Sequence, residues 1–403
     1  MSEAPKKPSL TPLDDALVAL LAQALPLADC ETMPAMAARG RVLATDLISP
    51  VDVPPADNSA MDGYAVRAAD AAAALPVTQR VPAGSLPQPL AVGEAARIFT
   101  GAQLPPGADA VVMQEHTELL DGRVRATQPV TPGQHVRLRG EDLKAGNVVL
   151  PAGTRLDAVA LGLAATAGAA ELTVTRRPRV ALFSTGDELV MPGEPLPPGA
   201  IYNSNRFTLR ALLEGLGCEV IDLGIVPDRL EATRAALREA AARADVILTS
   251  GGVSVGEEDH LRPAVQAEGH LDLWAIAIKP GKPFAHGRVG AAHFIGLPGN
   301  PVSSLVTFLV LVRPFLLKLQ GATYLAPRGY RIAAGFDWPR PDKRREFLRV
   351  SLDDANGLAL FGNQSSGVLT SAFWADGLLD NPPGHAFKAG DTVRFIPFSE
   401  LLS

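Results

Sequence analysis

The run Asp245-Val246-Ile247-Leu248-Thr249 leads into a loop of small residues that ends in three carboxylates. An unbroken apolar, β-branched run predicts a strand that is buried on both faces of a parallel sheet. The loop begins Ser250-Gly251-Gly252 and ends Glu257-Glu258-Asp259. Glycine lets backbone N–H groups approach an anion closely, and carboxylates hold a divalent cation that binds such an anion. The stretch therefore predicts a site for a phosphate-bearing ligand with a metal ion, at the end of a buried strand.

Residues 178–324 alternate between strand-like and helix-like segments. This alternation predicts a doubly wound α/β domain, in which ligands bind beyond the carboxyl ends of the strands. Asp228 and Glu231 form a start that resembles a capping box for the helix expected at 228–243. The expected strands are 179–184, 218–226, 245–249, 273–278 and 293–297, and the expected helices are 204–216, 228–243 and 301–319.

The segments on either side of this domain differ from it in composition and in the length of their apolar runs. Residues 9–48 and 140–177 predict an N-terminal helical and linker domain. Residues 49–139 interrupt it with frequent Pro and Gly and short apolar runs, which predicts an inserted β-rich domain. Residues 325–403 return to short strands and predict a small C-terminal β-barrel. The predicted fold class is multidomain α/β plus β, since 403 residues exceed the usual size of a single core.

Composition argues against several classes of protein. The net charge is −6 and no basic run occurs, so nucleic acid is not an expected partner. Cys30 and Cys218 are far apart in sequence and give neither a disulfide framework nor zinc spacing. The most apolar segment, 305–317, is interrupted by Arg313 and Pro314 and is expected to be too short to span a membrane. The polar N-terminus does not resemble a signal peptide, so a cytoplasmic protein is expected.

Three loops leave the carboxyl ends of the expected strands, at 184–188, 249–259 and 296–301. The last opens a helix, whose N-terminus favours anions, and Lys279 and Lys282 add two positive charges nearby. Taken singly, each loop is more often a plain turn or cap, and each lysine a solvated side chain. Their shared sheet edge favours a functional cleft. The G-x-S-x-G pattern at 252–256 is also typical of hydrolases, but the carboxylates that follow it would oppose oxyanion chemistry.

Taken together and in order, seven segments of the chain resemble one family closely. The family is the molybdopterin molybdenumtransferases of the MoeA type, which also form the C-terminal domain of gephyrin. The α/β part alone also resembles molybdopterin adenylyltransferases, and the segments around Asp62 and Thr100 separate the two. The matching segments are Asp57-Asn58-Ser59-Ala60-Met61-Asp62-Gly63-Tyr64-Ala65, Thr100-Gly101-Ala102, Arg139-Gly140-Glu141-Asp142, Ser184-Thr185-Gly186-Asp187-Glu188-Leu189, 249–259, Lys279-Pro280-Gly281 and Leu297-Pro298-Gly299-Asn300-Pro301-Val302-Ser303.

The resemblance implies an elongated homodimer of four-domain chains. Each cleft would lie between the α/β domain of one subunit and the inserted domain of the other. The implied reaction inserts molybdate into adenylylated molybdopterin, releases AMP and requires Mg²⁺. Molybdopterin adenylyltransferase and molybdoenzyme chaperones are further candidate partners by the same resemblance.

The resemblance also assigns roles to individual residues. The implied catalytic residues are Asp62, Thr100, Asp142, Glu188, Asp259 and Lys279, and the implied magnesium ligands are Asp228, Asp259 and Glu188. The implied substrate-binding residues are Gly251, Gly252, Ser254, Gly256, Lys282, Pro298, Gly299, Asn300, Arg137, Arg349 and Ser371. Because a pyrophosphate and molybdate repel each other, a metal ion and basic groups must offset that repulsion. No covalent nucleophile is required.

The sequence departs from the family pattern at three positions and leaves two other functions open. Ala275 stands where many bacterial relatives carry a basic residue, His260 replaces the more usual Tyr, and Val350 stands where glycine is common. The alternatives are adenylyl transfer to molybdopterin and a gephyrin-like scaffold that binds partner peptides without catalysis. The joint presence of Asp62, Glu188, Asp228 and Asp259 favours an enzyme over a scaffold.

Overall fold

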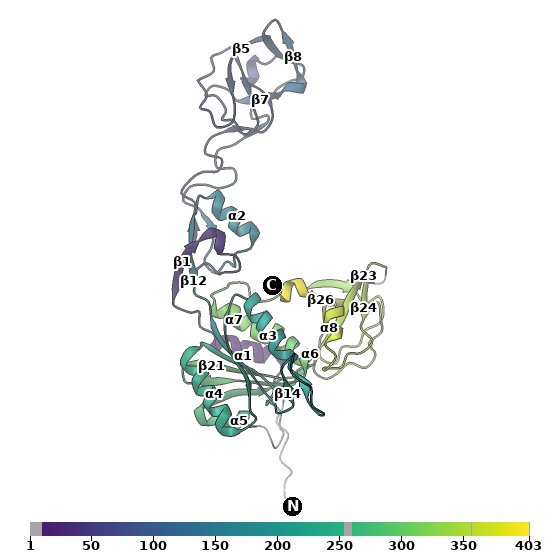
Figure 1. Cartoon of the computed structure of the whole chain (residues 1–403). Helices are drawn as coiled ribbons and strands as arrows, with labels where there is room; N and C mark the ends of the chain where they lie inside the picture. Colours follow the sequence, from purple (N-terminus) through teal and green to yellow (C-terminus); the bar gives the residue numbers. More distant parts are fainter. Residues whose placement is uncertain (1–9, 254–259, 356, 403) are drawn as a thin grey trace, which may run out of the picture.

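The computed structural model describes residues 10–253, 260–355 and 357–402. Figure 1 shows an extended molecule with an α/β body at one end and a small β-rich domain at the other. A slender linker domain joins the two, and the C-terminal β domain lies beside the α/β body. The arrangement matches the predicted fold class of several α/β and β-rich domains.

The α/β body is built on a six-stranded sheet with the order β16-β13-β17-β21-β20-β18. The first four strands in this order are parallel, and β20 runs antiparallel to both of its neighbours. Strand β20 was not among the strands expected from the sequence. The strands are β13 (Arg179–Thr185), β16 (Glu219–Val226), β17 (Val246–Ser250), β18 (Gly269–Ala275), β20 (Pro283–Val289) and β21 (Ala292–Leu297), and a short pair, β14 (Leu189–Val190) and β15 (Ile201–Tyr202), follows β13.

Helices cover both faces of this sheet. On one face Val180 and Leu182 of β13 pack in a core with α1, α3, α6 and α7. On the other face Ala181 and Phe183 pack with α4 and α5. Successive side chains of a strand point to opposite faces, so an unbroken apolar run serves both cores. The helices are α1 (Leu13–Gln23), α3 (Ser204–Gly215), α4 (Leu230–Arg243), α5 (Leu261–Glu268), α6 (Pro301–Thr307) and α7 (Arg313–Leu319), with the π-helical η4 (Phe308–Val312) between the last two.

The helical segment Pro301–Leu319 is long and apolar enough to cross a membrane, with a mean hydropathy of 1.8. The expectation that no segment reaches this length was wrong, because Pro314 lies at the start of α7 and the helix continues past it. A π-helical turn directly before Arg313 accommodates the proline. Since 89% of the segment is buried inside the fold, its apolar surface is that of a core helix.

The linker domain pairs two distant parts of the chain. Its strands β1 (Cys30–Pro34) and β12 (Glu171–Thr175) are antiparallel, and Asp157 caps α2 by accepting a hydrogen bond from the Ala160 N–H at 2.8 Å. The other elements are η1 (Ala35–Ala37), β2 (Leu47–Ile48), β11 (Val148–Leu150) and α2 (Ala158–Thr166).

The inserted domain is a six-stranded sheet with the order β7-β4-β6-β5-β9-β8, and a separate pair, β3 and β10, lies beside it. Its strands are short, as the Pro- and Gly-rich sequence predicts. The elements are β3 (Asn58–Ser59), β4 (Gly63–Val66), η2 (Ala68–Asp70), β5 (Leu75–Val81), β6 (Ala95–Ile98), β7 (Ala110–Met113), η3 (Gln114–His116), β8 (Thr117–Leu120), β9 (Arg123–Ala126) and β10 (Val136–Arg137).

The C-terminal domain is a small sheet that closes on itself. Its strand order is β19-β23-β25-β26-β22, with β24 on β23, and a bridge between Ala334 and Leu358 returns the chain after β22 to β24. Strand β19 comes from the α/β body, so the two domains share a sheet. The elements are β19 (Ile278–Lys279), β22 (Tyr330–Ala333), β23 (Arg345–Asp353), β24 (Gly357–Leu360), α8 (Thr370–Trp374), β25 (Gly377–Asn381), β26 (Thr392–Pro397) and α9 (Phe398–Leu401).

Candidate functional site

Two glycine loops meet at the carboxyl edge of the α/β sheet. Gly251 follows β17 with a φ of +91°, and a Cβ there would lie 2.4 Å from the carbonyl oxygen of Thr185. A Cβ on Gly299, after β21, would lie 3.8 Å from the Cα of Gly251. The absence of side chains at Gly251 and Gly299 thus lets the backbones of three strand ends approach each other.

Unsatisfied polar atoms line the same edge. The Oγ1 atoms of Thr185 and Thr249 and the Nδ2 of Asn203 are buried, and none of them has a hydrogen-bond partner among the described residues. Asn205 donates from Nδ2 to the carbonyl of Gly299 at 2.8 Å and holds the third loop in place. Buried polar groups normally have partners, so these free atoms suit a polar ligand. Thr185 and Thr249 stand in loops that the sequence already singles out, although neither was assigned a role. Asn203 and Asn205 were missed, since single polar residues at the start of a helix carry no distinct signal.

Carboxylates follow two neighbouring strands at this edge. The backbone N–H of Asp228 donates to Oδ1 of Asp187 at 3.2 Å, which joins the loops after β16 and β13. Glu188 is exposed, and its Oε2 lies 2.6 Å from where a Cβ of Gly186 would be. The helix after Asp228 begins at Leu230 with Arg229 in the cap position, two residues later than expected.

This edge supplies some of the ligands that a magnesium site needs. Asp259, Ser254 and Gly256 lie outside the described residues, and within the described ranges no three His, Cys, Asp or Glu side chains form a metal-binding group. Mg²⁺ in nucleotide sites is usually held by one or two carboxylates together with substrate phosphates. Glu188 and Asp228 supply oxygen donors of that kind.

Lys279 lies where β19 joins the C-terminal sheet. Its Nζ is 3.2 Å from Oε1 of Glu346 and 3.5 Å from Oδ2 of Asp342. Glu346 has no exposed side-chain surface, whereas Lys282 is exposed. The ammonium of Lys279 is therefore held by carboxylates of the C-terminal domain beside the sheet edge.

Arg349 and Ser371, both assigned to substrate binding, are buried and contact each other. The Nε of Arg349 donates to Oγ of Ser371 at 3.1 Å, and Nη1 donates to the Phe347 carbonyl at 3.1 Å. Burial lowers the pKa of Arg349 to about 10. The nearby Ser366 carbonyl accepts from the Val302 N–H at the start of α6, 2.9 Å away. The segment beside Arg349 is thus tied to the start of α6, which follows the loop that contains Pro298 and Asn300.

In the inserted domain Asp62 and Thr100 form a direct pair. Both the backbone N–H and the hydroxyl of Thr100 donate to Oδ1 of Asp62, each at 2.7 Å. These two hydrogen bonds hold the pKa of Asp62 below its usual value, with a smaller contribution from the charge of Arg97. Asp62 is therefore an ionised, oriented acceptor on the surface of the domain.

Arg137 and Asp142 line one cavity of about 380 Å³ at the base of the inserted domain. Arg137 is paired in register with Asn58, which lines the same cavity. The Ser59 N–H donates to the Ala102 carbonyl at 2.9 Å, which ties this cavity to the loop that carries Thr100. The four residues assigned to the inserted domain thus gather at one end of it.

Within one chain the two groups of residues lie apart. Figure 1 places the inserted domain at the opposite end of the molecule from the sheet edge of the α/β body. Asp62, Thr100, Arg137 and Asp142 therefore cannot reach the loops of Gly251 and Gly299 in this conformation of a single chain.

The fold defines a multidomain α/β protein with a candidate site at the carboxyl edge of a doubly wound sheet. Comparison with known proteins identifies the family within this class. Residues 11–168 match the MoeA N-terminal region (domain I and II), residues 181–318 match a probable molybdopterin binding domain, and residues 331–398 match the MoeA C-terminal region (domain IV).

Individual relatives agree with the family models. A molybdopterin molybdenumtransferase of Haemophilus influenzae is 44% identical over 91% of this chain and 93% of its own, and one of Nostoc sp. is 40% identical over 89% and 86%. A crystal structure of a molybdopterin biosynthesis MoeA protein from Pyrococcus horikoshii superposes with a TM-score of 0.84 at 30% identity, covering 96% of this chain and all of the other. The chain belongs to the MoeA family of molybdopterin molybdenumtransferases, enzymes of molybdenum cofactor biosynthesis, which confirms the resemblance seen in the sequence.

Proposed function

We propose that this protein inserts molybdate into adenylylated molybdopterin in the cytoplasm, in a Mg²⁺-dependent reaction that releases AMP. The observation that carries the proposal is the sheet edge, where glycine loops, unsatisfied polar atoms and two carboxylate loops converge. Backbone N–H groups in such loops suit phosphates, and Glu188 and Asp228 suit the metal ion. When bound, Mg²⁺ would neutralise the phosphate charge that otherwise repels molybdate.

The site residues divide into two groups by domain. Gly251, Gly252, Pro298, Gly299 and Asn300 would bind the adenylylated molybdopterin through backbone and small side-chain contacts. Lys279, held by Glu346, would place a positive charge where the anions meet. Lys282 is proposed to border the same cleft. The buried pair Arg349 and Ser371 is proposed to support it from the interior of the C-terminal domain, and Ser254, Gly256 and Asp259 are proposed to complete the loop after β17.

The second group consists of the residues of the inserted domain, and its position supports a homodimer. Asp62, Thr100, Arg137 and Asp142 gather on a domain that one chain holds away from its own sheet edge. A site that uses both groups is incomplete without a second copy. We therefore propose that the inserted domain of one subunit covers the sheet edge of the other, where the Asp62 carboxylate acts as a fixed acceptor.

The decisive assay follows AMP over time with purified protein, adenylylated molybdopterin, Mg²⁺ and molybdate. The proposal predicts AMP release that depends on molybdate and stops when EDTA removes the metal ion. Synthesis of adenylylated product from ATP and molybdopterin without molybdate would instead identify an adenylyltransferase. Peptide binding with no AMP release would identify a scaffold. The variant Asp228→Ala lacks a proposed metal ligand. It should abolish AMP release, while circular dichroism shows an intact fold.

A further inference from the structure

A second polar cavity lies in the C-terminal domain. It has a volume of about 500 Å³, and none of the residues assigned to the site above lines it. Three arginines and one aspartate line it, from four strands that are neighbours in the sheet: Arg345 on β23, Asp380 on β25, Arg394 on β26 and Arg331 on β22. The lining therefore carries two positive charges in excess of its negative charge.

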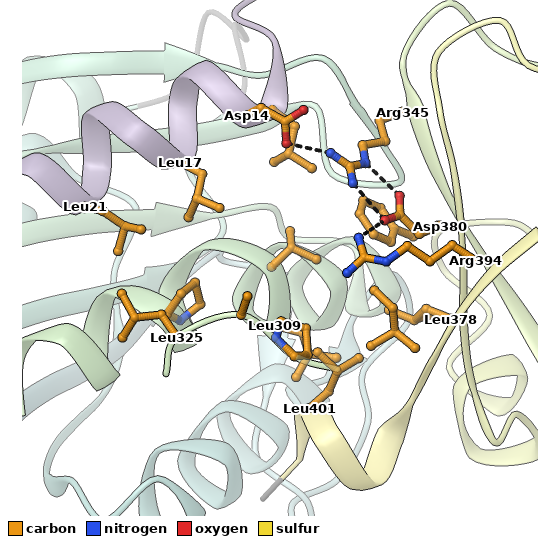
Figure 2. Close-up of a pocket in the computed structure, with 17 residues that line it drawn as sticks. Asp14, Leu17, Leu21, Leu309, Leu325, Arg345, Leu378, Asp380, Arg394 and Leu401 are labelled. Carbon is orange, nitrogen blue, oxygen red and sulfur yellow. Dashed lines mark hydrogen bonds and ion pairs between the residues drawn. The ribbon is translucent and has the colours of Figure 1, made fainter. Parts of the chain in front are cut away.

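The aspartate is shared by two of the arginines. Arg345 donates from Nε and Nη2 to the two oxygens of Asp380 at 2.6 and 2.7 Å, and Arg394 donates to Oδ2 at 2.8 Å (Figure 2). The Asp380 side chain is only 2% exposed. Arg345 also reaches the exposed Asp14 of α1 at 2.6 Å, outside this cavity (Figure 2). The charge of Arg345 is thus offset by two carboxylates. Arg394 donates one N–H group to Asp380, and its side chain is still 46% exposed.

Arg331 has a different environment. It lies directly opposite Arg394 in the antiparallel pair of β22 and β26. Like charges directly opposite each other destabilise a pair of strands. Among the described residues, Arg331 makes no hydrogen bond or ion pair that would offset this repulsion. Two guanidinium groups therefore face one cavity with spare donors.

Gly329 gives Arg394 its position in this arrangement. A Cβ on Gly329 would lie 2.7 Å from Nε of Arg394, so any side chain there would displace the guanidinium. Gly329 lines the same cavity. The close approach keeps Arg394 against the backbone at the mouth of the cavity.

We propose that this cavity binds a small phosphate-bearing molecule, with its phosphate between Arg331 and Arg394. The planar guanidinium matches a phosphate through two parallel hydrogen bonds, and two of them on adjacent strands suit one dianion. A phosphate monoester carries about −1.5 to −2 charges at neutral pH, close to the excess positive charge of the lining. The volume lies within the range of small-molecule sites. This site is separate from the proposed catalytic cleft.

Calorimetric titration of the full-length protein with inorganic phosphate tests the proposal. Arg331→Gln should weaken phosphate binding about tenfold, as expected for the loss of charge-assisted hydrogen bonds. Arg328→Gln is the matched control, because it removes the same charge from an exposed position outside the cavity and should leave the affinity unchanged. Molybdate-dependent AMP release should be the same in wild type and Arg331→Gln.

Three results would overturn the proposal. The first is an affinity that Arg331→Gln leaves unchanged, or that Arg328→Gln weakens equally. The second is a crystal structure of the protein soaked in phosphate in which the anion lies only at the edge formed by Gly251 and Gly299. Density between Arg331 and Arg394 would support it. A wild-type protein that shows no saturable binding up to about 10 mM phosphate would also refute it.

Discussion

The ammonium of Lys279 lies 3.2 Å from Oε1 of Glu346, a carboxylate with no exposed surface in the C-terminal domain. The other oxygen of Glu346 accepts from Nε1 of Trp338 at 2.8 Å and from the backbone N–H of Asp342 at 3.1 Å. Each oxygen therefore has its own donors. The contact fixes a basic residue of the proposed cleft through a domain that follows it by more than sixty positions in sequence.

Glu346→Gln should destabilise the protein and lower its activity. An amide group replaces one oxygen with a donor, which then faces either Lys279 or the Trp338 and Asp342 N–H groups. We expect a loss of about 2–4 kcal/mol in the free energy of unfolding, since a buried partner of several donors is lost. Urea titration measures it. Glu239→Gln, on an exposed helical pair with Arg243, is the control and should change stability by less than about 0.5 kcal/mol.

Thr100 should act through Asp62. Thr100→Val removes the hydroxyl donor but keeps the backbone N–H, so the Asp62 carboxylate loses one of two hydrogen bonds that hold it. We expect Thr100→Val to lower the rate of AMP release about tenfold or more, and Asp62→Asn to lower it about a hundredfold. Thr100→Ser restores the donor and should return most of the activity. Equal activity in Thr100→Val and wild type would show that the pair is structural.

Sequence patterns predicted those parts of the fold that have local signals. The buried run before Ser250 and the proline at the first position of the Pro301 helix both appear where expected. Strand β20 was missed because it begins with Pro283 and contains Gly287, which weaken a strand pattern. The last helix was expected over 301–319, and it does continue through the Arg313-Pro314 step, where a π turn before Arg313 accommodates the proline.

The candidate site was predictable only where several residues stand close in sequence. The glycine loops and the Asp62 segment carry such patterns. Glu346 does not, because Arg344-Arg345-Glu346 looks like an ordinary solvated charge run, although the structure buries its carboxylate fully. The separation of the inserted domain from the sheet edge depends on the linker pairing of β1 with β12, which joins residues about 140 positions apart.

Gly251 should tolerate no side chain. Gly251→Ala would place a Cβ 2.4 Å from the Thr185 carbonyl oxygen in a residue with a φ of +91°. Gly84→Ala is the matched control, because its φ is +81° but no atom lies within 4 Å of the added Cβ. The control should cost about 1–2 kcal/mol from backbone strain alone. We expect Gly251→Ala to cost clearly more in thermal unfolding and to abolish AMP release. A cost no greater than that of Gly84→Ala would contradict the close approach.

The pair of buried histidines should make stability fall in mild acid. His286 and His293 are 3% and 7% exposed, and burial lowers the pKa of each to about 4. Their rings lie 5.7 Å apart, with Phe315 against both, Arg288 and Asp245 near His293, and Asp272 and His270 near His286.

The direction of the effect follows from proton uptake. Between pH 4 and 6.5 the unfolded chain binds protons on these histidines that the folded chain does not bind. Stability should therefore be complete above about pH 6.5 and should fall steadily towards pH 4, by up to roughly 3 kcal/mol per histidine. Urea midpoints across this range measure it. His293→Gln should flatten the dependence, whereas His116→Gln, on the η3 turn where no residue is buried, should leave the slope unchanged.

Mixing two inactive variants tests whether the site is shared between subunits. Asp62→Ala removes the inserted-domain acceptor and Asp228→Ala removes a proposed metal ligand, and each protein alone should be inactive. If each site takes Asp62 from one chain and Asp228 from the other, a mixed dimer contains one intact site and one doubly defective site. Random exchange makes about half of the dimers mixed, so activity should return to about a quarter of wild type. A double variant, Asp62→Ala with Asp228→Ala on one chain, mixed with wild-type protein, gives mixed dimers in which every site carries one defect, so its activity should fall to about the same quarter. If both residues of a site came from one chain, the two single variants would stay inactive after exchange, and the double variant mixed with wild type would keep about half of the activity.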